Sequence, residues 1–230
     1  MSDPLRIALV AEGPTDRVVV QAAVEAIIPN RPFILRQIQP EQSAAFGEIG
    51  TGWVGVYRWC GQSVARRAAN AGADPLFGSY DLLLIHLDVD VAGHSYADGS
   101  IAGEPDDLPC ALPCPPASDS TDALRAVLLR WFGQNPQAPN VVLCTPSKST
   151  EAWVLTALFP NDVAVPVIEC HPDALSRFGV QPAKVRLKKT VRDYENARPK
   201  MTAAWSRLIK TLSEASRFQV EFETAVAFFP

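Results

Sequence analysis

The sequence lacks the features that mark membrane-spanning, secreted and P-loop proteins. No run of about 18 apolar residues occurs, so we expect no transmembrane helix and no membrane partner. The N-terminal segment shows no basic stretch followed by a small-residue cleavage site, so we expect no signal peptide. The motif G-x-x-x-x-G-K-[ST] is missing, which excludes ATP hydrolysis through a P-loop.

Positive charge and cysteine are both scarce. Lys and Arg number 21 against 25 Asp and Glu, for a net charge of −4. Any binding of nucleic acid must therefore use a local basic patch or metal ions. The five cysteines are odd in number in a chain of 230 residues, so we expect no disulfide framework and a reducing, cytoplasmic location.

Four short apolar segments predict the strands of one sheet. Residues 5–11 are apolar and lead into a turn and a helix, for which Thr15 is a plausible N-cap. Residues 81–87, DLLLIHL, have the pattern of a central strand that is buried on both faces. Residues 33–38 and 140–144 predict two more strands. Helical segments alternate with these strands, which predicts an α/β fold with about four parallel strands flanked by helices.

The remaining segments suggest one principal domain with an appendage. We expect a domain over residues 1–160 that contains a proline-rich loop at 91–119, and a C-terminal helical extension over 161–230 packed on it. The expected helices cover residues 18–28, 62–71, 120–132, 151–158 and 192–213. Between them, Trp53, Tyr57 and Trp59 either stack on nucleic-acid bases or pack in the core.

Acidic residues follow three of the predicted strands. Glu12 ends the first strand, and Asp88 and Asp90 follow the strand at 81–87. Glu151 opens the helix after the last strand. Ligands of open parallel sheets bind at the carboxyl ends of the strands, so these four carboxylates should meet at one edge. They would repel one another unless a cation lay between them, and oxygen ligands suit Mg²⁺ or Mn²⁺.

Three motifs in this order resemble those of the TOPRIM domain. This is the fold of topoisomerases, primases and the OLD (overcoming lysogenization defect) nucleases. The first motif is EGPTD at residues 12–16, and the second is DVD at residues 88–90. The third, SKSTEAW at residues 147–153, looks like the S-x-E-A-W-L signature of standalone TOPRIM-like proteins related to OLD nucleases. The resemblance covers about residues 5–160.

The resemblance implies a role for each acidic residue. Glu12 would be a metal ligand or general acid/base, and Asp88 and Asp90 would be the metal-binding pair. Glu151 would be the additional acid that holds a second metal. Lys148 would stabilise charge on a phosphate, or would be only a solvated lysine of the turn. Two such metals cleave phosphodiester bonds by positioning a water and stabilising the leaving oxygen.

The implied activity is that of a Mg²⁺- or Mn²⁺-dependent endonuclease acting on DNA or RNA, in defence against phage. One alternative is a TOPRIM subunit that is inactive alone and acts with a partner P-loop ATPase. Another is a phosphatase of the haloacid-dehalogenase type, with Asp88 as nucleophile and Asp90 as acid/base. That family places its motif on the first strand, whereas here it follows a later one. Association into a homo-oligomer is a further expectation.

One basic concentration stands out in the C-terminal part. Its residues would contact phosphates without reading sequence, or would form only a solvated helix face, because Asp193 and Glu195 interrupt it. The predicted nucleic-acid-binding residues are Lys184, Arg186, Lys188, Lys189 and Arg192.

Two weaker metal candidates involve cysteine and histidine. Cys110 and Cys114 have nearly the spacing of zinc ligands, but a zinc site would have to recruit His94 and Cys144. His86 lies inside the strand at 81–87, where a histidine is usually a core residue with satisfied hydrogen bonds.

Overall fold

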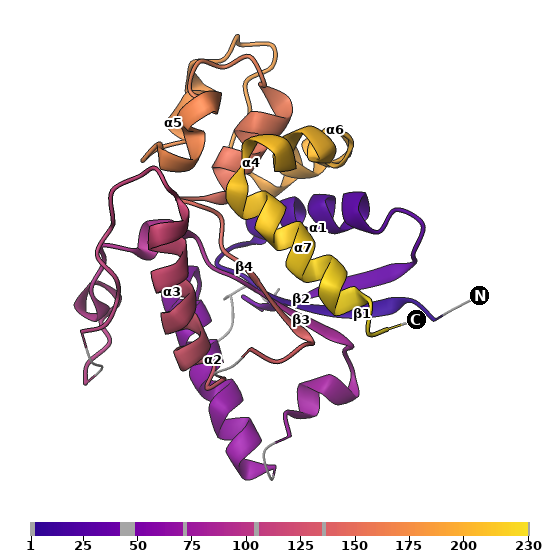
Figure 1. Cartoon of the computed structure of the whole chain (residues 1–230), viewed down its shortest axis with the longest axis vertical. Helices are drawn as coiled ribbons and strands as arrows, with labels where there is room; N and C mark the ends of the chain where they lie inside the picture. Colours follow the sequence, from indigo (N-terminus) through magenta and orange to yellow (C-terminus); the bar gives the residue numbers. More distant parts are fainter. Residues whose placement is uncertain (1–2, 42–48, 71–72, 104–105, 135–136, 230) are drawn as a thin grey trace.

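The computed structural model describes residues 3–41, 49–70, 73–103, 106–134 and 137–229, which form a layered α/β fold (Figure 1). Within these residues, four parallel strands form one sheet in the order β2-β1-β3-β4. The predicted fold class, a parallel sheet of about four strands flanked by helices with further helices at the C-terminus, is confirmed. The strands are β1 (Leu5–Val10), β2 (Phe33–Gln39), β3 (Leu82–His86) and β4 (Val141–Cys144).

Helices cover both faces of the sheet. One face carries α1 (Pro14–Ile27), α4 (Thr150–Leu158), α6 (Val191–Thr211) and α7 (Ser213–Val226). The other face carries α2 (Gly52–Ala69) and α3 (Ser118–Trp131), as Figure 1 shows. Among the described residues, no helix is both long and apolar enough to cross a membrane.

The central strand β3 explains why the sheet is buried on both sides. Successive side chains of a strand point to opposite faces. Leu82 and Leu84 therefore enter the core beneath α1, while Leu83 and Ile85 enter the core beneath α2 and α3. All four are fully buried. This arrangement requires the continuous apolar run that the sequence shows, and it fixes where β3 ends relative to β1 and β4.

Two helices begin earlier than expected from the sequence. Helix α1 takes Gly13 as its N-cap instead of Thr15, because Pro14 has the backbone angle of a first helical residue. Helix α2 begins at Gly52 instead of residue 62. The helix expected over residues 192–213 is confirmed as α6, which ends at Thr211, and a further helix that the sequence did not indicate, α7, follows it from Ser213.

The aromatic residues expected to stack on bases or in the core lie on α2. The Trp59 ring stacks on Phe132 with centroids 6.1 Å apart, and Tyr57 meets the edge of Trp131 at 5.3 Å. Trp53 also stacks on Trp131. These contacts hold α2 against α3, which accounts for the helix beginning earlier than its polar pattern indicated.

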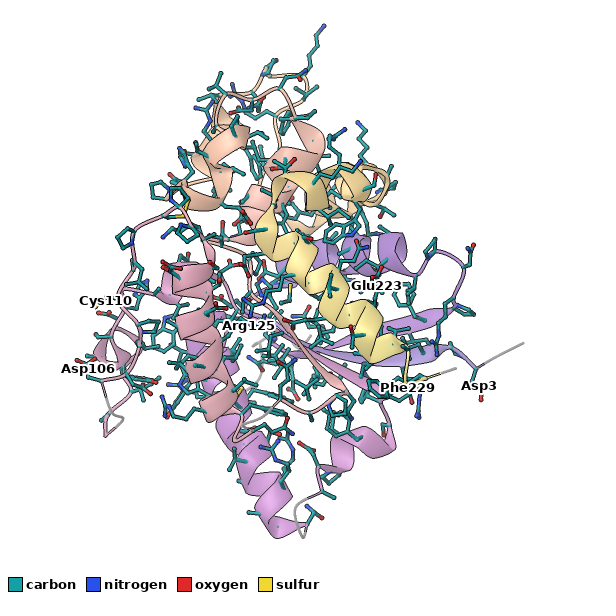
Figure 2. The ribbon with its side chains drawn as sticks, viewed as in Figure 1. Asp3, Asp106, Cys110, Arg125, Glu223 and Phe229 are labelled. Carbon is teal, nitrogen blue, oxygen red and sulfur yellow. A yellow bond between two sulfur atoms is a disulfide. The ribbon has the colours of Figure 1, made fainter. Side chains whose placement is uncertain are left out.

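The C-terminal extension shares a core with the preceding domain. Trp153 of α4 packs edge-on against Trp205 of α6, with ring centroids 5.5 Å apart, and lies 5.9 Å from Phe218 of α7. Arg125 of α3, labelled in Figure 2, is buried and donates hydrogen bonds to Leu143 of β4 and to Glu221 of α7. Helices α6 and α7 are therefore part of the same folded unit as the sheet.

The expectation that the chain has no disulfide is wrong. Cys114 of the proline-rich loop is bonded to Cys170, at the end of the short 3-10 helix η4 (Val165–Cys170). The two residues are 56 positions apart, so their pairing depends on how the loop lies on the extension, which residue spacing cannot reveal. The bond also removes Cys114 from the zinc site considered above. Cys144 is buried at the end of β4.

Candidate metal centre

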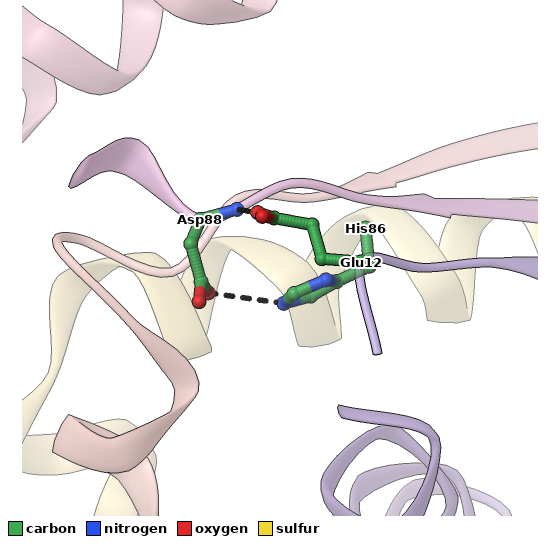
Figure 3. Close-up of side chains that lie close together, drawn as sticks. All are labelled: Glu12, His86 and Asp88. Carbon is green, nitrogen blue, oxygen red and sulfur yellow. Dashed lines mark hydrogen bonds and ion pairs between the residues drawn. The ribbon is translucent and has the colours of Figure 1, made fainter. Parts of the chain in front are cut away.

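The carboxyl ends of β1, β3 and β4 meet at one edge of the sheet. Parallel pairing aligns Val10 with Ile85, and His86 with Cys144, so the residues that follow each strand emerge together. Glu12 reaches across this edge, and its carboxylate accepts a hydrogen bond of 2.7 Å from the backbone N–H of Asp88 (Figure 3). The sheet thus brings the first two acidic motifs into direct contact.

His86 completes a group of three ligating side chains at this edge. It is the last residue of β3 and has no exposed surface. Its Nε2 atom lies 3.2 Å from Oδ1 of Asp88, as Figure 3 shows. One ligand atom from each of Glu12, His86 and Asp88 lies within 4.8 Å of the other two. This separation places all three within reach of a single ion.

The imidazole of His86 is not satisfied by the protein. Neither of its ring nitrogens forms a hydrogen bond of acceptable geometry with the described residues, although both are buried. The contact with Asp88 is short enough for an ion pair but not aligned as a hydrogen bond. His86 is therefore buried as expected, but it is not a core histidine with satisfied hydrogen bonds.

Asp16 and Thr150 join the acidic motif of β1 to helix α4. The Thr150 hydroxyl donates to Oδ1 of Asp16 at 2.8 Å, and the Thr150 N–H donates to Oδ1 of Asp88 at 3.1 Å. The other oxygen of Asp16 accepts from the N–H of Gly13 at 2.9 Å. Asp16 was not among the predicted site residues, although it is the last residue of the EGPTD motif. Its role here is to hold α1, α4 and the end of β3 in register.

The C-terminal extension supplies a counter-charge and a hydrogen bond to Glu151. It is buried, and its Oε1 atom accepts a hydrogen bond of 3.0 Å from the Tyr194 hydroxyl. The ammonium group of Lys189 lies 2.8 Å from the same oxygen. Two residues of the C-terminal extension thus contact the carboxylate that the resemblance assigns to a second metal. Lys189, predicted to bind nucleic acid, is engaged inside the site.

The electrostatics of the cluster favour a cation. Removal from water raises the pKa of Asp88 well above its usual value, and the negative charges of Asp16 and Glu151 raise it further. Burial likewise raises the pKa of Glu12, with the charge of Asp88 as the next cause. Burial alone would lower the pKa of Lys189, but the charge and hydrogen bond of Glu151 outweigh it and raise it. A metal ion would stabilise the ionised forms of Glu12 and Asp88.

Asp90 and Lys148 border the cluster. Asp90 is exposed, and its N–H donates to the carbonyl of Lys148 at 3.0 Å, which links the two strand ends. Although the residue is exposed, neighbouring atoms remove part of its carboxylate from water, which raises the pKa of Asp90. The charge of the nearby His94 acts in the opposite direction and lowers this pKa. Lys148 adopts a positive φ of 64°, and among the described residues its side chain forms no ion pair or hydrogen bond. Both side chains are accessible to a ligand that approaches this edge.

The basic segment lies at the surface beside α6. Lys184, Arg186, Lys188 and Arg192 are exposed, and Arg186 donates to the carbonyl of Gln181. A groove of about 440 Å³ runs along this segment. It is lined by Lys184, Arg186 and Lys200 together with Leu158, Phe159 and the first turns of α6.

The donor set fits a divalent ion. Two carboxylates and a buried imidazole, whose nitrogens have no hydrogen-bond partner among the described residues, are groups of the kind that first-row divalent metals bind. Comparison with protein-family models, with curated proteins and with solved structures finds no match for this chain. The resemblance to TOPRIM and OLD proteins therefore depends on the three sequence motifs.

Proposed function

We propose that this protein is a metal-dependent nuclease that cleaves phosphodiester bonds in DNA or RNA. The observation that carries the proposal is the group of Glu12, Asp88 and His86 at the carboxyl edge of the sheet. Both His86 nitrogens are buried, and neither forms a hydrogen bond with the described residues. Open parallel sheets bind their ligands at this edge. The order of the motifs, which resembles that of TOPRIM nucleases, supports phosphodiester chemistry over other metal-dependent reactions.

Each residue of the site would have a separate role in such a reaction. A bound Mg²⁺ or Mn²⁺ would polarise a phosphoryl oxygen and acidify a water molecule. Glu12 and Asp88 would hold the ion, and Asp90, which is exposed beside them, would face the substrate. The ammonium group of Lys148, which has no partner among the described residues, lies at the same edge, where it would stabilise negative charge on the phosphate. Glu151 would position α4 through its bonds to Lys189 and Tyr194.

The exposed basic segment supports a polymeric substrate. Cationic side chains that track a phosphate backbone give affinity without sequence specificity. We expect Lys184, Arg186, Lys188 and Arg192 to provide this contact, since all four are exposed. Their loss would raise the KM for a long nucleic acid more than it would lower kcat.

A second candidate is a TOPRIM subunit that acts with a partner, such as a P-loop ATPase in phage defence. It is favoured by exposed valines concentrated in the extension. Val163 is 84% exposed, Val180 63% and Val167 60%, in a protein whose other valines are mostly buried. Val163 and Val180 line one groove, which a homo-oligomer would also use.

Cleavage by the purified chain tests the proposal. Plasmid, linear duplex and single-stranded DNA and RNA would be incubated with Mg²⁺ or Mn²⁺, with p-nitrophenyl phosphate as a monoester substrate. We expect metal-dependent cleavage of a polymer that is abolished by Glu12→Ala, because Glu12 is a ligand of the ion. Glu41→Ala removes an exposed carboxylate and should cleave normally.

The alternatives give different results in the same experiment. Cleavage that persists in Glu12→Ala would place the activity elsewhere and contradict the proposal. Absence of cleavage with intact metal binding would favour the partner-dependent subunit. Hydrolysis of the monoester alone would favour the phosphatase.

A further inference from the structure

We infer that His86 is a nitrogen ligand of the metal ion, and that it makes the site select Mn²⁺ or another first-row transition ion over Mg²⁺. The inference deepens the proposed function and rests on it for the biological role of the ion. It concerns the identity of the metal and not the reaction, so metal binding alone can test it. None of the three motifs contains His86.

The first argument is the state of the imidazole. His86 is fully buried at the end of β3, and neither Nδ1 nor Nε2 has a hydrogen-bond partner among the described residues. Buried polar groups are nearly always paired, and an unpaired one needs an explanation. A bound ion supplies the missing partner for one nitrogen. A histidine at this position is unfavourable if its only role is packing, because an apolar residue would fill the same space without a buried unsatisfied group.

The second argument is distance. Nε2 of His86 lies 3.2 Å from Oδ1 of Asp88 without the alignment of a hydrogen bond. Two ligands that each bind one ion at about 2.1 Å, with an angle of about 90–110° between them, are roughly 3.0–3.4 Å apart. The observed separation lies within this range. Glu12 provides a third ligand atom within 4.8 Å of both.

The third argument is the donor set. Mg²⁺ prefers oxygen ligands and retains much of its water, whereas imidazole suits transition ions. Mn²⁺ accepts both carboxylate oxygens and an imidazole nitrogen. Replacement of one oxygen ligand by His86 therefore shifts the preference of the site away from Mg²⁺, while Glu12 and Asp88 keep it suited to a divalent ion.

Pulsed electron paramagnetic resonance of bound Mn²⁺ tests for this ligand directly. The chain has only three histidines, His86, His94 and His171, so labelling histidine with ¹⁵N reports on a small set. We expect a directly coordinated ¹⁴N coupling that changes to ¹⁵N on labelling. The signal should survive in the double variant His94→Gln/His171→Gln, which leaves His86 as the only imidazole and alters residues that are not buried. Absence of any histidine nitrogen coupling, or its loss in this double variant, would overturn the inference.

Calorimetry tests the selectivity. The wild-type chain should bind Mn²⁺ at least about tenfold more tightly than Mg²⁺, following the general order of ligand preference. His86→Gln should retain weak binding of both ions and lose most of the difference between them. Equal affinities in the wild-type chain would contradict the inference. Nitrogen coordination without cleavage of any polymer would support the inference and contradict the proposed nuclease. Cleavage without nitrogen coordination would support the nuclease and contradict the inference.

Discussion

Asp88→Asn is expected to abolish activity and at the same time to stabilise the metal-free protein. Asp88 is almost fully buried, and the charges of Asp16, Glu151 and Asp90 all oppose its ionisation. An asparagine keeps an oxygen that can accept the hydrogen bond from the N–H of Thr150, but it carries no charge. We expect the free energy of unfolding without metal to rise by about 1–2 kcal/mol, as it does when strain at a functional site is relieved.

If the proposed function holds, the activity of this variant should fall by more than the roughly 10–100-fold that changes to outer partners of metal ligands cost, because Asp88 is itself a ligand in the proposed site. Added Mn²⁺ should raise the melting temperature of the wild-type chain, through binding to the native state, and should leave that of the variant nearly unchanged. Cleavage assays measure the activity. Calorimetric and denaturant-induced unfolding, with and without metal, measure the melting temperature and the free energy of unfolding.

Asp106→Asn is the matched control for this variant. It removes the same charge from an exposed position in the proline-rich loop, at the far side of α3 in Figure 2. Its stability, its response to Mn²⁺ and its activity should all be those of the wild-type chain. If Asp88→Asn instead destabilised the metal-free protein, Asp88 would be a structural residue, and the interpretation of the cluster as a metal centre would be wrong.

The strands, and the edge of the sheet at which the acidic motifs meet, could be predicted because they depend on local sequence. A continuous apolar run such as residues 81–87 has few ways to be buried other than as a central strand, and residues that end parallel strands share an edge. Glu12 and Asp88 were predicted in this way to lie at one edge of the sheet. The hydrogen bond from the Asp88 N–H to the Glu12 carboxylate shows that they do.

The remaining features depend on contacts between distant segments. His86 has the same place in the sequence pattern whether its nitrogens form hydrogen bonds or not, and only the tertiary structure shows that they form none with the described residues. The pairing of Glu151 with Lys189 requires the extension to fold back over α4, and the bond between Cys114 and Cys170 requires the loop to reach η4. Neither follows from periodicity or spacing, because both depend on tertiary packing.

The pairing of Glu151 with Lys189 leads to the second large expected effect. Lys189→Met should lower the free energy of unfolding by about 2 kcal/mol. Removal of one partner from a buried pair costs about 3–5 kcal/mol. The effect is smaller here because the Lys189 side chain is 41% exposed and solvent screens the pair. Tyr194 also continues to donate to Glu151 in the variant.

Lys188→Met is the control for this prediction. Lys188 is exposed, and among the described residues only its backbone forms hydrogen bonds: its N–H donates to Asp193 and its carbonyl accepts from the N–H of Thr190. We expect urea-induced unfolding of this control to match that of the wild-type chain. The double variant Lys189→Met/Glu151→Gln should recover most of the lost stability, because the charge left buried in the single variant is then absent. A double variant as unstable as the sum of its single changes would show that the two residues act independently. The extension would then contribute to the site only by covering it. Recovery would show that Lys189 is the counter-charge of Glu151 beside the candidate metal centre.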